Sequence, residues 1–82
     1  MEQEILDALR PEFPDVQGNI VWEESTDRYN GHLVSNGFQL LSFVERQQRV
    51  FRILRAHLGP QAHLISMLFT YTPAEYEQLQ AA

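Results

Sequence analysis

The feature of this sequence that most restricts its fold is one long helix whose start and end are both marked. Ser42 and Glu45 match a capping box, in which each side chain satisfies a backbone amide of the other residue. Gly59-Pro60 supplies the stop signal. The segment between them is a helix of about 17 residues, roughly 25 Å long. The rest of an 82-residue chain must cover the apolar side of this helix.

The helix is amphipathic, and one polar residue interrupts its apolar side. An arc of roughly 120° holds Phe43, Val50, Phe51, Leu54 and Leu58. Gln47 falls near the middle of this arc, and an unpaired buried amide would cost on the order of 1–3 kcal/mol. We therefore predict a hydrogen-bond partner for Gln47. Glu45, Arg49 and Arg52 lie opposite the arc, with Arg46 and Arg55 on its flanks.

The first half of the chain predicts a helix and two strands. Helical spacing of apolar residues indicates a helix over 2–10, which Pro11 ends. A strand is expected at 19–24, with Ile20 and Trp22 on one face. Two turn signals compete after it. A turn at 25–27 gives a second strand at about 28–35, whereas Asn30-Gly31 would be a tight hairpin turn; we favour the first.

The last part of the chain predicts a third strand and a short helix. Residues 63–71 are apolar at both alternating sets of positions, which predicts a strand covered on both faces. Thr72 as N-cap, Pro73 at the first helical position and Glu75 at the third begin a helix of about two turns. The order α-β-β-α-β-α predicts a single α+β domain over 1–82, with helices packed on a three-stranded mixed sheet.

Composition excludes several functions. The chain has no cysteine, so it forms no disulfide and offers no thiol to a metal or substrate. It lacks a phosphate-binding glycine loop, an H-E-x-x-H motif and any evident nucleophile–base pair, and Glu23 and Glu24 point to opposite strand faces. We expect no enzymatic activity. The acidic start and the absence of a long apolar run predict a cytoplasmic protein with no membrane contact.

Three motifs in order resemble the BolA family. The first runs from Phe38 through Ser42, Val44-Glu45-Arg46-Gln47-Gln48 and Val50-Phe51, close to the family's F-x-G-x-S-x-V-x-R-H-R-x-V-Y. His63-Leu64-Ile65-Ser66 and Tyr71-Thr72-Pro73-Ala74-Glu75-Tyr76 follow, similar to H-A-[LV]-S and Y-T-P-x-E-W. The Gln-Gln pair is similar to the YrbA-type branch. The resemblance covers about residues 19–76 and supports the second strand at 28–35.

The resemblance implies a fold and a function. BolA-like domains have a class II KH-like fold without the nucleic-acid-clamping G-x-x-G loop, and they pair with monothiol glutaredoxins, share a [2Fe–2S] cluster and act in iron handling, stress response or transcriptional regulation. It implies a non-enzymatic adaptor in which His63 is a candidate cluster ligand. This chain alone would bind no cluster, because the cysteine ligands must come from a partner.

This sequence also departs from the family pattern. Leu40 stands in place of the glycine, Arg28 precedes Tyr29 where the family often has a histidine, and the 63–71 segment is one residue longer, which requires a bulge or a shifted strand end. His32 is the only nearby substitute for a second ligand; His57 is interpreted as structural.

Two alternative functions remain open. One is a divergent BolA fold that binds no cluster. The other is a KH-like nucleic-acid-binding regulator, which would use the arginine face of the long helix. That face consists of Arg46, Arg49, Arg52 and Arg55, and with Arg28 and Tyr29 it is also a candidate partner surface. A net charge of -5 opposes strong nucleic-acid binding. We expect a monomer or a weak homodimer.

Overall fold

A computed structural model of the protein describes residues 1–81. The chain forms three α-helices, three strands and two short 3-10 segments. In order they are α1 (Glu2–Leu9), β1 (Gln17–Glu23), β2 (Arg28–Val34), η1 (Asn36–Phe38), α2 (Phe43–Leu58), η2 (Gly59–Leu64), β3 (Ile65–Tyr71) and α3 (Pro73–Ala81). The predicted order α-β-β-α-β-α and the α+β class are confirmed.

The three strands form one mixed sheet in the order β1-β2-β3. β1 pairs with β2 antiparallel, and β2 pairs with β3 parallel. The β1–β2 hairpin turns at residues 24–27, and Glu23 pairs with Arg28. Asn30 and Gly31 lie inside β2 and pair with β1. The turn at 25–27 is therefore confirmed, and the alternative turn at Asn30-Gly31 is wrong.

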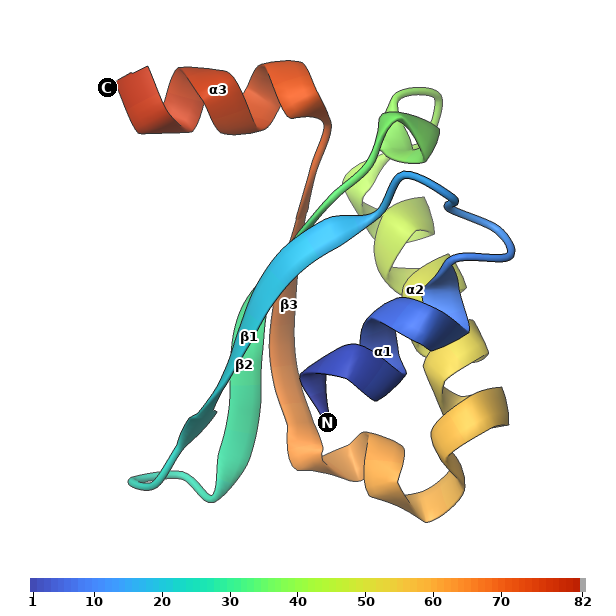
Figure 1. Ribbon diagram of the computed structural model, residues 1–82, viewed down its shortest axis with the longest axis vertical. Helices are drawn as coiled ribbons and strands as arrows, with labels where there is room; N and C mark the ends of the chain where they lie inside the picture. The colour runs from blue at the N-terminus through green and yellow to red at the C-terminus, as the bar shows by residue number, and fades with distance from the viewer. Residues whose placement is uncertain (82) are drawn as a thin grey trace.

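Helices α1 and α2 cover one face of the sheet, which we call the inner face (Figure 1). The core lies between this face and the two helices. Its fully buried side chains include Ile5 and Leu9 of α1, Leu33 and Leu68 of the sheet, Val50 and Leu54 of α2, and Phe38. Ile20 and Trp22 share the inner face, as the sequence predicts, but Trp22 lies near its edge and is 43% exposed.

The opposite face of the sheet, which we call the outer face, is largely open. Figure 1 shows α3 leaving the end of β3 and extending over this side, away from α1 and α2. Met67 and Phe69 of β3 point to the outer face and are 51% and 53% exposed. The prediction that β3 is covered on both faces is therefore wrong, because the one helix on this side covers only one end of the sheet.

The extra residue of the 63–71 segment is taken up by a bulge in β3. Tyr29 pairs with Ile65, but the next residue, Asn30, pairs with Met67. Ser66 therefore has no partner on β2. From Met67 onward, the side chains of β3 again alternate regularly between the two faces of the sheet. The sequence required a bulge or a shifted strand end, and the structure has both, since β3 also begins only at Ile65. Within residues 1–81, no helix combines the length and the apolar character that crossing a bilayer requires.

Candidate functional site

His63 lies before β3 and not within it. It belongs to η2, the 3-10 segment that joins α2 to β3, and its side chain is exposed. The expectation that His63 opens the strand is corrected, because β3 begins two residues later, at Ile65. The ring Nδ1 contacts the carbonyl oxygen of Pro60. A carbonyl only accepts hydrogen bonds, so in the neutral imidazole this contact assigns the ring proton to Nδ1 and leaves the lone pair on Nε2.

A shallow hollow surrounds His63. It has a volume of about 460 Å³, and Phe51 and Arg55 of α2 line it together with the 59–63 turn and Ile65. Gly59 makes this turn with a φ of 58°, a left-handed conformation in which a side chain would be strained. Its amide donates to the carbonyl of Arg55, so the predicted helix stop is confirmed. The hollow thus joins an exposed imidazole, a guanidinium and an aromatic ring.

His32 occupies a different surface. It lies in the middle of β2, on the outer face, directly opposite Phe69. Its ring stacks on Tyr76 of α3, with centroids 4.8 Å apart and planes 19° apart. The structure therefore does not bring His32 and His63 together, since the residues beside His63 come from the helix that covers the inner face. Within residues 1–81, no cluster of three or more His, Cys, Asp or Glu side chains is arranged to hold a metal ion.

Arg28 and Tyr29 follow the hairpin turn at the start of β2. Tyr29 lies partly buried against the core and meets Trp22 edge-to-face, with ring centroids 4.9 Å apart. Arg28 is half-buried and donates to the backbone oxygen of Asp27, its neighbour in the chain. Tyr29 is thus a packing residue, and Arg28 stands at the turn end of the hairpin.

Arg46 is not on the surface, which corrects its assignment to the arginine face. The residue is only 4% exposed. Its Nε donates to the carbonyls of Phe38 and Leu41 at 3.0 and 3.1 Å. Its Nη1 donates to the carbonyl of Thr70 at 3.2 Å. One guanidinium therefore connects α2 to the loop that precedes it and to the unpaired edge of β3.

The same guanidinium holds α3. It makes a two-point contact with the Glu75 carboxylate, at 2.8 Å and 3.3 Å. Glu75 also accepts from the Thr72 amide at 2.8 Å, and its own amide donates to the Thr72 hydroxyl, so the predicted helix start at 72–75 is confirmed. The bonds from Arg46, followed by the one from the Thr72 amide, hold the pKa of Glu75 below its ordinary value. The Phe43 ring lies over the Arg46 guanidinium at 4.8 Å and is 64% exposed, although the sequence placed Phe43 on the buried arc.

The other three members of the arginine face lie on the surface. Arg49 and Arg52 both approach Glu12, at 3.9 and 3.8 Å, and exposed pairs of this kind contribute little to stability. Arg55 lines the hollow beside His63. His57 is exposed in the last turn of α2. The face is therefore smaller than the sequence suggested, and an acid partly neutralises it.

The capping box of α2 and the partner of Gln47 are both as predicted. Ser42 and Glu45 bond each other's backbone amides at 2.9 and 3.2 Å, and the bond from the Ser42 amide lowers the pKa of Glu45. Gln47 donates to the Leu68 carbonyl at 2.7 Å. With Arg46 on Thr70, adjacent residues of α2 thus satisfy two carbonyls of β3, which is an edge strand.

Sequence reasoning missed a polar contact that fixes the start of η1. Asp15 accepts from the Ser35 hydroxyl at 2.6 Å and from the Asn36 amide at 2.8 Å, and these bonds, the first above all, lower the pKa of Asp15. Ser35 is 1% exposed. The partners are about 20 positions apart in the chain, so no local signal could have revealed the contact.

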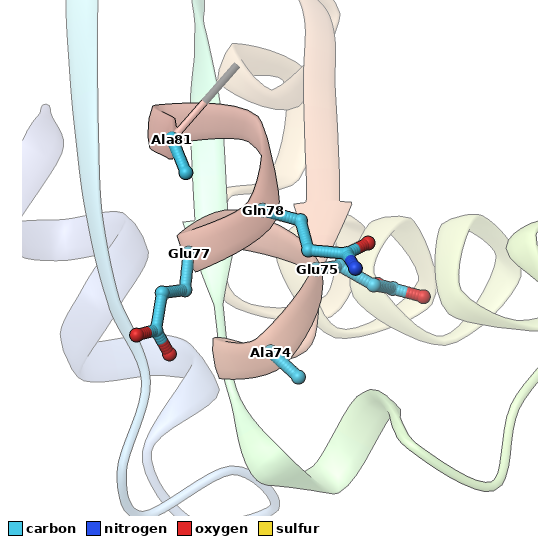
Figure 2. A pocket seen from close by; sticks show the side chains of 5 residues that line it. All are labelled: Ala74, Glu75, Glu77, Gln78 and Ala81. Carbon is cyan, nitrogen blue, oxygen red and sulfur yellow. The ribbon is translucent and has the colours of Figure 1, made fainter.

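A second hollow, of about 510 Å³, runs along α3 itself. Figure 2 shows its lining residues, with Glu77 pointing to one side of the helix and Glu75 and Gln78 to the other. The polar side chains do not converge, and Glu75 is already engaged by Arg46. This hollow is therefore not a candidate site.

The element order and the mixed sheet define an α+β domain with the fold of BolA proteins. Two solved structures match it over 89% of this chain and 92% of theirs, each at 24% sequence identity: BolA1 from Arabidopsis thaliana, with a TM-score of 0.68, and the BolA domain of SufE1 from the same plant, with a TM-score of 0.69. No family model and no curated protein matches the chain. The structural likeness extends beyond the three motifs, which lie within residues 38–76, since it covers 89% of this chain.

Proposed function

We propose that this protein is a non-enzymatic, cytoplasmic BolA-like adaptor that binds a monothiol glutaredoxin and contributes His63 to a [2Fe–2S] cluster shared with it. The proposal rests on the exposure of the His63 side chain and on the contact that its ring makes in this fold. Its side chain is exposed, its Nδ1 is engaged by a backbone carbonyl, and its Nε2 is left as a ligand atom.

The contact with Pro60 matters because it resembles the environment of a metal-binding histidine. Such histidines usually donate their other ring N–H to a carboxylate or a backbone carbonyl, which fixes the tautomer and the orientation of the ring. Pro60 and His63 belong to the same 3-10 segment, η2, so the carbonyl that meets the imidazole lies one turn before it in the chain. An imidazole nitrogen is also an accepted ligand of iron–sulfur clusters, where it replaces a thiolate.

Among residues 1–81, no second candidate ligand lines the hollow around His63. The chain contains no cysteine, and His32 lies on the outer face away from the His63 hollow. The remaining ligands must be thiolates of a partner, together with glutathione. Arg55 and Phe51, which line the same hollow, are the residues that a partner bound at His63 would contact first.

Nucleic-acid binding has less support. One of the four arginines is buried, and two of the remaining three approach Glu12. A phosphate backbone would thus meet few free guanidinium groups on a protein of net charge -5. A strong, salt-dependent affinity for nucleic acid would favour this alternative.

The test is cluster reconstitution with a monothiol glutaredoxin and glutathione, followed by visible absorption and circular dichroism. We expect the wild-type protein to change the spectrum of the glutaredoxin cluster and His63→Ala to leave it unchanged. His57→Ala is the matched control, because His57 is also exposed and lies outside the hollow. Calorimetric titration of the two proteins without iron measures whether they bind at all.

Two results would contradict the proposal. If the wild-type protein leaves the cluster spectrum unchanged, the fold serves another purpose. If His57→Ala and His63→Ala both reduce the spectral change equally, the effect is one of surface charge and His63 is not a ligand.

A further inference from the structure

The outer face of the sheet and α3 together form an apolar groove, which we call the outer groove. It has a volume of about 390 Å³, and its main lining residues are Val21, His32, Phe69, Tyr71, Tyr76 and Leu79. Val21, Phe69 and Leu79 are each more than half exposed. All three strands and α3 contribute to this surface. A continuous exposed apolar patch of this kind is typical of an interaction site.

The first turn of α3 is fixed by contacts with two parts of the molecule, and these contacts set the shape of the groove. Glu75 is fixed from the core side by the Arg46 guanidinium. Tyr76, the next residue, stacks on His32 and lies 5.9 Å from the ring of Tyr71. α3 is therefore already positioned along one side of the groove. A ligand would not lose binding free energy in ordering this helix.

The charges around the groove are mainly acidic. At the hairpin end, Glu23 accepts a hydrogen bond from Asn30 of the outer face, and Glu24 and Asp27 follow in the turn, with Arg28 the one opposing charge there. On α3, Glu77 adds a further acid and no basic residue opposes it, whereas the charge of Glu75 is already paired with Arg46. A partner with apolar and basic side chains would complement this surface.

The size of the groove indicates what kind of partner it fits. Three strands of seven residues make a face of roughly 23 by 14 Å, or about 320 Å². A stable dimer interface takes about 800 Å² from each partner. A second copy of this chain would also bring two acidic hairpins and two acidic α3 helices together. The face instead suits one helix, whose diameter with side chains is about 10 Å.

We infer that the outer groove binds a basic amphipathic helix of another protein, with its apolar side against Phe69 and Leu79 and its basic residues near Glu23 and Glu77. This surface is separate from the hollow around His63, which faces α2. The inference does not depend on the proposed cluster function. If both hold, the chain can engage two proteins at once.

The test uses two synthetic peptides of about 14 residues, or roughly 21 Å as helices. Both carry leucines at i, i+3, i+4 and i+7; one has lysines at the other positions and the second has glutamates. Titration into the ¹⁵N-labelled protein follows backbone amide signals. We expect the Leu/Lys peptide to shift the signals of Val21, His32, Phe69 and Leu79, and the Leu/Glu peptide to shift none.

A matched pair of variants distinguishes binding in this groove from non-specific binding to exposed apolar residues. Leu79→Ser removes an exposed leucine from the groove, and Leu40→Ser removes one that is 94% exposed in the loop before α2. We expect Leu79→Ser to weaken Leu/Lys binding about tenfold and Leu40→Ser to change it less than twofold. Shifts that gather around Leu40 and Phe43 or around Arg55 and His63, equal effects of the two variants, or no binding would each overturn the inference. So would concentration-dependent shifts of the groove signals without peptide, which would identify a second copy as the occupant.

Discussion

Arg46 is expected to be the residue outside the apolar core whose loss destabilises the fold most. Replacing it with alanine leaves the carbonyls of Phe38, Leu41 and Thr70 without their donors, and the first and last of these contacts are buried. It also removes the salt bridge to Glu75, which holds the first turn of α3 in place.

The expected size of the loss follows from these contacts. Each buried acceptor left unpaired costs about 1 kcal/mol or more, and hydrogen bonds from a charged group are worth more than neutral ones. With the packing of the arginine stem added, Arg46→Ala should lower the free energy of unfolding by about 3–4 kcal/mol. A chain of 82 residues has a total stability of roughly 4–12 kcal/mol, so the variant should lose at least about a quarter of it.

The assay is urea denaturation, followed by the fluorescence of Trp22 and by circular dichroism. Arg46→Lys should recover part of the loss, because an ammonium can serve some of the acceptors but cannot make the two-point contact with Glu75. Arg49→Ala is the control and should cost less than about 0.5 kcal/mol, since Arg49 is exposed and 3.9 Å from its acid. If Arg46→Ala costs no more than Arg49→Ala, the buried role of Arg46 is refuted.

Two further predictions concern the polar contacts. Gln47→Met should keep the packing of α2 but lower the free energy of unfolding by about 1–2 kcal/mol in urea, because the Leu68 carbonyl loses its donor; a variant as stable as wild type would contradict this. The pKa values of Asp15 and Glu75 are lowered in the folded protein, so their stabilising effect is complete at neutral pH and is lost as the pH falls below about 4 and through the folded pKa values. Asp15→Asn should therefore flatten the decline of stability in acid, and an unchanged decline in this variant would contradict the reasoning.

The parts of the fold that short-range signals specify could be predicted from the sequence. The capping box at Ser42, the stop at Gly59 and the helix start at Thr72 each depend on residues within a few positions, and all three are confirmed. Gln47 was also predictable, because a polar residue inside an apolar arc must find a partner.

The position of Arg46 was not predictable from helical periodicity. Helical periodicity predicts the direction in which each side chain points around the helix axis. It contains no information about which turns of the helix lie over the sheet and which lie at its edge. The first turn of α2 lies beside the edge of β3, whose carbonyls need donors, so an arginine is buried there and Phe43, on the apolar arc, covers it from outside. Similarly, the apolar residues of β3 predicted two covered faces, but the outer face remains open beyond the reach of α3.

The bulge at Ser66 leads to a final prediction about the His63 end of the sheet. Because Ser66 has no partner on β2, its deletion joins Ile65 to Met67 and leaves every later residue on its present face. The shortened chain should fold and lose less than about 1.5 kcal/mol of stability, because no core residue changes its surroundings.

Deletion of Phe69 is the matched control. It removes one residue from the regular part of β3 and forces Leu68 or Thr70, which are 1% and 2% exposed, onto the outer face. Loss of the Leu68 burial alone costs about 2–3 kcal/mol. Urea denaturation of both chains should therefore separate them clearly. If both deletions unfold the protein equally, the bulge does not absorb the extra residue, and the placement of His63 two residues before the strand would have to be revised.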